Sequence, residues 1–378
     1  MTEWLVVGAG VAGSVIAGRL AATGASVAVV EQGGNSTPGH DLFEALAVSE
    51  RVRSTPLVRR VDGGPLVPYT AGIGLGGGSA INGSIVSLSG PFAHAHSLPI
   101  ETDHQIVRAT RNGTRIDVWS AYGRPSSVNP LLDTEADQVL VDGARCVGVR
   151  CSDGSEVMAQ QVVVCAGALG SPLLLLRSGV ARSAVGHGLQ DHPAVMVRYR
   201  RPSGSPRSER AIAAVERRGP LQLMHLDRVG AVDDGTAGVI VMLMRPRSSG
   251  RVVIDAAGTP DINFSLGSSE RDVSELADGV RGLIAGGIEG DLEAAPSPGE
   301  EVAWVRNELA LTTPVVMHPT STCAMGTTVD RLGRLRGIDD LFIADASVFP
   351  RIPSVNPMLP TVQLAETLVD RWIAAGLV

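Results

Sequence analysis

Histidine and cysteine side chains are the first candidates for chemistry in this sequence. Eight histidines occur, and an imidazole can act as a base near neutral pH because its ordinary pKa lies there. Cys323 follows His318 by five residues, a spacing that could suggest a cysteine–histidine nucleophile pair. The segment is strand-like, however, and residues an odd number apart on a strand point to opposite faces, which argues against the pair.

Two other arrangements are weak on their own. His94, His96 and His104 could suggest a metal site, but no carboxylate stands at helical spacing, so we interpret them as surface histidines and expect no metal. Ser79 lacks the complete Gly-x-Ser-x-Gly elbow, which argues against a serine hydrolase. The four cysteines form no Cys-x-x-Cys pair, so we expect free thiols in a reducing compartment.

The clearest chemical signal is a glycine-rich turn near the N-terminus, Gly8-Ala9-Gly10-Val11-Ala12-Gly13. Gly8 would permit the tight turn. Gly10 would let a pyrophosphate approach the backbone closely, and Gly13 would let a helix pack close to the sheet. The N–H groups at the start of that helix would be free to bind phosphate. Glu31 ends the next apolar run and could accept hydrogen bonds from a ribose hydroxyl. The pattern predicts a dinucleotide site without distinguishing NAD from FAD.

The elements that must position this turn are those of a β-α-β unit. Apolar runs at 3–7 and 26–30 are typical of buried strands, and 14–23 has the pattern of the helix between them. Further along, strand-like runs at 138–141, 144–151 and 156–164 are separated by Asp-Gly pairs, which favour hairpin turns.

The sequence pattern changes between residues 195 and 315. Strand-like segments alternate with loops there, and one helix is expected at 273–285. This predicts a second domain of α+β type built on an antiparallel sheet. Residues 34–70 are polar and proline-dotted, and we expect them to be irregular. Residues 341–345 indicate a further strand and 361–375 a further helix.

Later segments resemble the signatures of the glucose–methanol–choline (GMC) oxidoreductases. The stretch from Gly74 to Gly83 is similar to the first signature, and that from Gly167 to Val180 is similar to the second. Val185 to His192, and then the histidine segment from His318 to Gly326 with its continuation through 344–361, follow in the family's order. Together with the glycine turn, these blocks extend from residue 4 to about 372, so the resemblance covers nearly the whole chain.

The resemblance implies both a fold and a cofactor. It predicts an α/β, Rossmann-like FAD-binding domain that is discontinuous, assembled from residues 1–90, 130–194 and 316–378. Residues 195–315 would form the substrate domain, and 91–129 a shortened lid or connecting region. No histidine stands where some members attach FAD covalently, so we expect non-covalent FAD.

Cofactor-binding positions follow from the same motifs. In this family the first signature lies along the flavin, Glu31 would bind the adenosine ribose, and Asp345 with Ala346 would lie near the diphosphate and the ribityl chain. The full set that the resemblance implies is Gly8, Gly10, Ala12, Gly13, Glu31, Gly76, Gly77, Gly78, Ser79, Asn82, Gly83, Ala136, Ala166, Gly167, Asp345, Ala346, Pro357 and Met358.

The resemblance also implies alcohol chemistry. Oxidation of a CH–OH group removes the hydroxyl proton and transfers a hydride to flavin N5, giving an aldehyde or ketone. His318 matches the catalytic histidine and would be the base, and Asn356 matches a second position where an amide can steady the developing alkoxide. His192 is expected in a loop near the pyrophosphate, without a chemical role. The alternatives are a hydroxynitrile-lyase-like member and a flavin-binding protein without redox turnover.

The chain is shorter than typical family members. The deficit falls mainly between Gly83 and the strand near Val139, a region that usually supplies a lid and part of the substrate channel. Ala181 replaces the glycine that usually closes the second signature. The substrate site is therefore open, or covered by a second copy or another partner chain, or built for a large alcohol. The sequence does not distinguish a quinone, a carrier and O2 as the electron acceptor.

Composition excludes several classes of partner. The formal charge is −7 and no basic stripe occurs, which argues against nucleic acid. No uninterrupted apolar run reaches about 18 residues, so no membrane span is expected. The first twenty residues lack a basic region before their apolar stretch, and we interpret them as a strand rather than a signal peptide. A cytoplasmic location is the resulting expectation.

Overall fold

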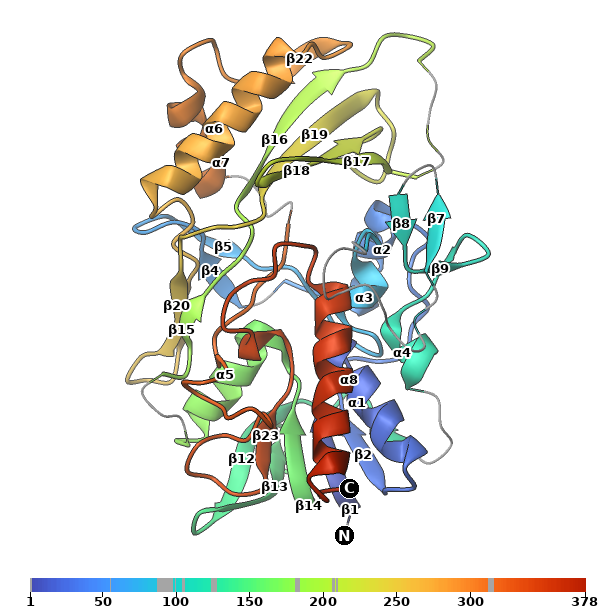
Figure 1. Ribbon diagram of the computed structural model, residues 1–378, viewed down its shortest axis with the longest axis vertical. Coiled ribbons are helices and arrows are strands. Elements are labelled where there is room, and N and C mark those ends of the chain that lie inside the picture. The colour runs from blue at the N-terminus through green and yellow to red at the C-terminus, as the bar shows by residue number, and fades with distance from the viewer. Residues whose placement is uncertain are drawn as a thin grey trace.

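The computed structural model describes residues 2–54, 56–86, 98, 100–103, 106–123, 128–180, 184–205, 208, 210–311 and 316–378 (Figure 1). His94, His96, His104 and Ala181 lie outside these residues. A mainly parallel sheet lies at one end of the long axis, and an antiparallel sheet with two covering helices lies at the other (Figure 1).

The parallel sheet has the order β11-β2-β1-β14-β23. The first part of β14 pairs antiparallel with β13, so a β12-β13 hairpin extends the sheet. The second part of β14 pairs in parallel with β1 on one side and with β23 on the other. The strands are β1 (Thr2–Val7), β2 (Val27–Val30), β11 (Val128–Leu131), β12 (Ala136–Asp142), β13 (Arg145–Cys151), β14 (Glu156–Val164) and β23 (Leu341–Ile343).

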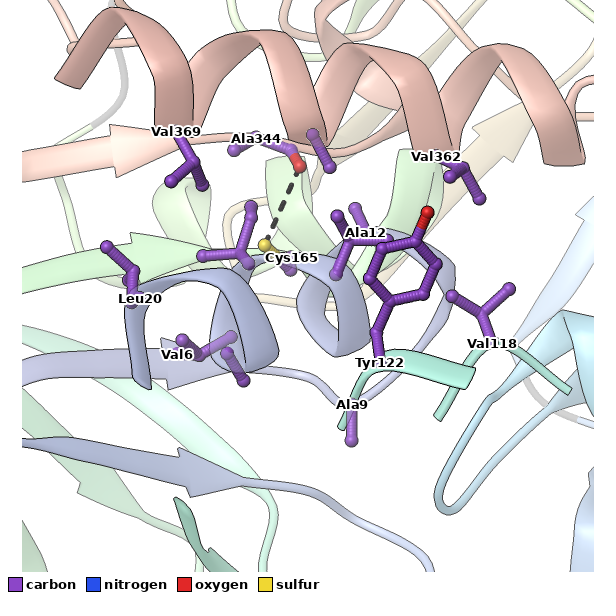
Figure 2. Packing of buried hydrophobic residues seen from close by; sticks show 14 of the residues in the cluster. Val6, Ala9, Ala12, Leu20, Val118, Tyr122, Cys165, Ala344, Val362 and Val369 are labelled. Carbon is purple, nitrogen blue, oxygen red and sulfur yellow. Dashed lines mark hydrogen bonds between the residues drawn. The ribbon is translucent and has the colours of Figure 1, made fainter. Parts of the chain in front are cut away.

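Helices cover both faces of this sheet because its strands are apolar on both sides. Alternate strand residues such as Val6 and Val163 pack against α1 (Val11–Ala22) and α8 (Met358–Ala374), which lie against each other (Figure 2). Their neighbours Leu5 and Val162 face α5 (Gly167–Arg177) on the other side. The short helix α4 (Val118–Tyr122) joins the first face, where the Tyr122 hydroxyl donates to Glu366 at 2.5 Å.

The antiparallel sheet has the order β17-β18-β19-β16-β22. Its strands are β16 (Ala194–Arg200), β17 (Ile212–Arg218), β18 (Leu221–Leu226), β19 (Thr236–Leu243) and β22 (Asp291–Ala294). One face packs on α6 (Glu270–Ala285) and α7 (Glu301–Leu311). The other face carries a second apolar cluster, which includes Met196, Met224 and Met242, and faces back into the molecule.

A third sheet, β15-β20-β21-β4-β5, lies between the two ends (Figure 1). Its strands are β4 (Leu57–Arg59), β5 (Leu66–Pro68), β15 (His187–Leu189), β20 (Gly250–Ile254) and β21 (Pro260–Asn263). The remaining elements are short: α2 (Leu42–Ala47), η1 (Ser49–Arg51), β3 (Val52–Arg53), β6 (Ala71–Gly72), α3 (Gly78–Ile81), β7 (Glu101–Asp103), β8 (Ile106–Arg108), β9 (Thr110–Arg111), β10 (Thr114–Arg115) and η3 (Ala346–Val348).

The predicted fold class is confirmed, with differences at particular elements. Both Asp-Gly turns join β12, β13 and β14 as expected. The prediction that residues 34–70 are irregular is wrong: they form α2, η1 and three strands, with Asp41 capping α2 through the N–H of Glu44. The sequence pattern does not predict the helix α7. Among its apolar side chains of described burial, Val305 and Leu309 are the ones firmly buried, which leaves a weak periodic signal. Among the described residues, no helix is both long and apolar enough to span a bilayer.

Candidate active site

The glycine turn between β1 and α1 leaves backbone uncovered where a phosphate would approach. Gly8 has φ +98°, and a Cβ there would lie 2.6 Å from the carbonyl oxygen of Cys165. A Cβ on Gly13 would lie 1.8 Å from the carbonyl oxygen of Gly8, so only glycine lets α1 start this close to the turn. A Cβ on Gly10 would meet no atom within 4 Å. This face of the turn is open to a ligand.

Glu31 holds three loops together at the end of β2. Its carboxylate accepts the N–H groups of Ala9 at 2.7 Å, Gly33 at 3.0 Å and Gly74 at 2.8 Å. Burial raises the pKa of Glu31, and these backbone hydrogen bonds and Arg51 oppose the shift. The carboxylate therefore organises the walls of the cradle, while its expected contact with an adenosine ribose stays a prediction.

The second glycine loop packs directly on the first. The N–H of Gly76 donates to the carbonyl of Ala9 at 2.8 Å, and a Cβ on Gly77 would lie 2.8 Å from the Cα of Gly10. Gly78, at the start of α3, has no atom within 4 Å of its Cβ position. Residues 8–13 and 74–78, far apart in sequence, thus pack together, and the Cβ positions of Gly10 and Gly78 face open space.

Asp345 connects the strand β23 to the N-terminus of α5. Its carboxylate accepts the N–H groups of Gly167 and Ser347, both at 2.8 Å, and the hydroxyl of Ser171. Burial raises its pKa against these hydrogen bonds. Ala166 precedes Gly167 as the N-cap of α5, and Ala346 begins η3 directly after Asp345. The second signature and residues 344–346 therefore meet at one edge of the parallel sheet.

Asn82 and Met358 bring the first signature to the start of α8. The Asn82 amide donates to the sulfur of Met358 at 3.1 Å, and Arg115 donates to the Asn82 amide oxygen at 3.1 Å and to the carbonyl of Ser79 at 3.2 Å. Pro357 is the N-cap of α8. Two of the expected cofactor-binding positions, Gly83 and Ala136, lie apart from these contacts. A Cβ on Gly83 would meet the side chain of Ile212. Ala136 begins β12, two residues after Thr134, whose N–H donates to the carbonyl of Glu31.

The residues around the open surface fit a dinucleotide. Uncovered backbone occurs at Gly10, Gly78 and Gly167, and the N-termini of α1 and α5 offer N–H groups beside it. Within the described ranges, no three His, Cys, Asp or Glu residues gather as they would around a metal ion.

His318 lies against His192 rather than alone. Their Nδ1 atoms are 3.0 Å apart, and the rings meet edge to face at a centroid distance of 5.2 Å. The Nε2 of His192 lies 3.0 Å from the carbonyl oxygen of Pro353. His192 is 2 % exposed whereas His318 is only half-buried. His192 lies in a loop between β15 and β16, as expected, and it connects the histidine segment to the segment before Asn356. That it has no chemical role of its own stays a prediction.

Asp191 positions both histidines through their backbones. One carboxylate oxygen accepts the N–H of His192 at 2.7 Å and the N–H of His318 at 2.9 Å. Burial raises the pKa of Asp191 to about 7, although Arg60 and the two backbone hydrogen bonds favour the carboxylate. Arg60, Tyr69, Asp191 and His192 line a small cavity beside the pair.

Asn356 is held by a residue that the sequence did not single out. The side-chain amide of Gln222, on β18, donates to the Asn356 amide oxygen at 3.2 Å, and both residues are buried. No sequence signal could have found Gln222, because it lies 134 residues from Asn356 in an unremarkable strand. The link shows that the antiparallel sheet reaches the same site as the C-terminal segment.

Cys323 is buried away from solvent among apolar side chains, and burial raises its pKa. A thiol with a raised pKa is a poor nucleophile because little thiolate forms. The prediction that this segment is strand-like is wrong, because residues 318–323 form a loop with an isolated bridge at Thr320. The burial and raised pKa of Cys323, rather than alternation along a strand, argue against a cysteine–histidine pair.

The geometry defines a class of protein: a two-part α/β fold with a glycine-lined cradle for a dinucleotide and a contact between His318 and His192 near the segment that precedes Asn356. Models of the GMC oxidoreductases match residues 101–194 and 246–365, which together make up more than half of the chain. The chain belongs to the GMC oxidoreductase family. FAD, the cofactor that this membership implies, fits the cradle described above.

The chain is also similar in sequence to curated relatives. The chain is 29 % identical to a 5-(hydroxymethyl)furfural oxidase of a Methylovorus species over 62 % of its own length and 55 % of the relative's. It is 28 % identical to an oxygen-dependent choline dehydrogenase of Paraburkholderia phytofirmans, over 69 % of its length and 60 % of the relative's. The chain thus matches less than two thirds of each relative.

The fold is shared with solved structures at lower identity. A formate oxidase of Aspergillus oryzae superposes with a TM-score of 0.84 at 18 % identity, covering 100 % of this chain and 99 % of that one. A pyridoxine 4-oxidase from Mesorbium loti superposes with a TM-score of 0.78 at 18 % identity, covering 99 % of both chains.

Proposed function

We propose that this protein oxidises a small-molecule alcohol to an aldehyde or ketone with FAD as its cofactor and His318 as the base. The observation that carries the proposal is the contact chain from His318 through His192 to Pro353, three residues before Asn356. It supports placing the proposed base and the proposed alkoxide partner in one site. When bound, FAD would supply the hydride acceptor at its N5 atom.

The proposed role of His318 is to take the hydroxyl proton. Burial lowers the pKa of His318 to about 3, so the imidazole is neutral at physiological pH and has a lone pair to accept that proton. The same shift makes His318 a weaker base than a free imidazole. Asn356 would bind the same oxygen. Its amide oxygen is engaged by Gln222, which leaves its NH2 group to donate to the oxygen as negative charge develops there.

The substrate panel follows from the relatives. Choline, 5-(hydroxymethyl)furfural and pyridoxine, which appear in the names of the relatives, are the first alcohols to mix anaerobically with the FAD-loaded protein. Bleaching of the flavin absorbance by any of them is the expected result. Oxygen uptake during turnover would then distinguish an oxidase from a dehydrogenase that uses a quinone or a carrier.

His318→Ala is the matching variant. We expect it to retain FAD and to reduce it about 10²–10⁴ times more slowly, the range for loss of a general base. Reduction at the wild-type rate would remove His318 from the mechanism. Retained FAD that no alcohol reduces would instead favour a hydroxynitrile-lyase-like protein or one without turnover, and release of cyanide from a cyanohydrin would identify the former.

A further inference from the structure

Three polar groups form a chain that ends at His318. The carbonyl oxygen of Pro353 lies 3.0 Å from Nε2 of His192, and Nδ1 of His192 lies 3.0 Å from Nδ1 of His318. Both distances are those of hydrogen bonds, so each needs one proton between its two atoms. The positions of these two protons determine which nitrogen of His318 is bare.

The first proton can sit in only one place. A carbonyl oxygen accepts and never donates, so Nε2 of His192 carries the hydrogen. A neutral imidazole has a single N–H, which leaves Nδ1 of His192 bare and able only to accept. The proton between the rings then belongs to Nδ1 of His318, and its Nε2 is the bare nitrogen.

This assignment requires His192 to be neutral, and its surroundings favour that form. Burial lowers its pKa well below the ordinary value, and the neighbouring His318 and Arg217 lower it further, against the carbonyls of Pro353 and Met244. Arg60 also lines the cavity beside the ring. Asp191 is the nearby acid, and its carboxylate oxygen accepts the two backbone N–H groups.

We infer that His192 is a positioning residue that fixes the tautomer of His318, with Nδ1 protonated and Nε2 bare, so that Nε2 accepts the substrate proton. The catalytic part of this inference rests on the proposed function. In the step, the substrate O–H bond breaks, the N–H bond forms at Nε2, and the electron pair stays on the substrate oxygen. The Nδ1–H of His318 remains bonded to His192, which steadies the imidazolium that results.

The tautomer can be observed without turnover. In the FAD-loaded protein labelled with ¹⁵N-histidine, we expect the Nδ1 of His318 to resonate as a protonated nitrogen and its Nε2 as a bare one. His318→Ala would assign the signals. Observation of a protonated Nε2 in the wild-type protein would overturn the inference, whatever the activity.

Two variants test the role of His192. In His192→Phe the ring remains without nitrogens, so we expect the bare-Nε2 tautomer to lose its preference and alcohol-dependent flavin reduction to slow about 10²-fold, with little change in KM. In His192→Asn the amide oxygen can take the place of Nδ1 as acceptor, so we expect the tautomer to return and most of the lost rate with it. His225→Phe, on β18, is the matched control and should leave both readouts unchanged.

These experiments distinguish a failure of the tautomer assignment from a failure of the proposed alcohol oxidation. Equal rates and equal tautomer signals in His192→Phe and wild type would overturn the positioning role. If His192→Phe does not fold, the tautomer in wild type and in His192→Asn still decides, because both should show a bare Nε2. A wild-type protein with the expected tautomer but no flavin reduction by any alcohol would contradict the proposed function and leave the tautomer assignment standing.

Discussion

At the scale of single residues, the site depends on polar groups that orient other polar groups. Asp191 accepts the N–H groups of His192 and His318 on one oxygen, although these histidines are 126 residues apart in sequence. Gln222 orients Asn356 in the opposite sense, because its side-chain amide donates to the Asn356 amide oxygen. Neither Asp191 nor Gln222 needs to touch substrate in order to affect the reaction.

Asp191 should make stability depend on pH. Its pKa is raised from an ordinary value near 3.8 to about 7, so the stability that it contributes is greatest below about pH 4 and declines as pH rises through 7. Asp191→Asn keeps an oxygen for both N–H groups and cannot ionise. We therefore expect the variant to gain stability relative to wild type between pH 4 and 7, by a few kcal/mol at most. Urea unfolding of both proteins across this range would measure it, and a difference independent of pH would contradict it.

Gln222 should affect the rate of flavin reduction through Asn356. Gln222→Glu places a carboxylate opposite the Asn356 amide oxygen, which favours a flipped amide whose NH2 faces that carboxylate rather than the substrate. We expect alcohol-dependent reduction to slow at least about tenfold, equivalent to about 1.4 kcal/mol of lost transition-state stabilisation. Stopped-flow absorbance would measure the rate. Gln160→Leu, an exposed change on β14, is the control, and equal slowing in both variants would refute a specific role.

At the scale of elements, the cradle depends on loops that touch without side chains between them. The turn before α1 and the loop before α3 meet at Gly10 and Gly77, and Glu31 holds both through backbone N–H groups. Each loop is short and glycine-rich because a side chain at the contact would separate them. The cradle is therefore a product of two elements and a carboxylate, not of one motif.

Two glycine variants should separate ligand binding from folding. Gly10→Ala adds a methyl group that meets no protein atom within 4 Å, so the fold should persist while FAD affinity falls about tenfold or more. Gly13→Ala forces a contact of 1.8 Å with the Gly8 carbonyl oxygen and should lower both thermal stability and FAD binding. FAD titration with thermal unfolding distinguishes them.

The control for Gly10→Ala and Gly13→Ala is Gly282→Ala on α6, because a Cβ at Gly282 would also meet no atom within 4 Å. We expect it to stabilise the protein by about 0.5–1 kcal/mol, because alanine favours a helix interior over glycine, and to leave FAD affinity unchanged. Unaltered FAD binding in Gly10→Ala would show that the ligand does not approach this turn.

At the scale of the whole molecule, α8 connects the site to the core beneath it. The helix begins at Met358, beside Asn82, and its other end carries Trp372, which stacks on Trp4 at a ring-centroid distance of 5.1 Å. Phe342 of β23 completes this aromatic group. The same helix therefore anchors the segment with Asn356 and packs on the parallel sheet.

Loss of this anchor should lower the stability of the whole protein. Trp372→Ala removes a side chain with 0 % exposure and should cost about 3–5 kcal/mol of unfolding free energy. Ile373→Ala, at the next position and 43 % exposed, should change it by at most about 0.5 kcal/mol. Chemical denaturation of the two variants would check the contrast, and similar losses in both would show that α8 is not anchored through Trp372.

Local spacing was enough to predict much of this architecture. The Asp-Gly turns, the apolar runs and the glycine turn each act within a few residues, so β1, α1, β2 and the β12–β14 meander could be recognised before any contact was known. The order of the later motifs then indicated FAD and an alcohol-oxidising family. The helix α7 could not be predicted, because Val305 and Leu309, which pack in the core beside α6 and β16, leave only a weak periodic pattern.

Contacts between distant segments decided the rest. The sequence around His192 is the same whether it is a loop residue without a role or a positioning residue. Only folding places its Nδ1 beside that of His318 and its Nε2 beside Pro353. Gln222 reaches Asn356 because β18 of the antiparallel sheet faces the start of α8. Sequence periodicity reports which face of an element is buried, but hydrogen bonds between elements depend on where those faces meet. The identity of the base could thus be expected from its motif, while the state of its two nitrogens follows only from the tertiary structure.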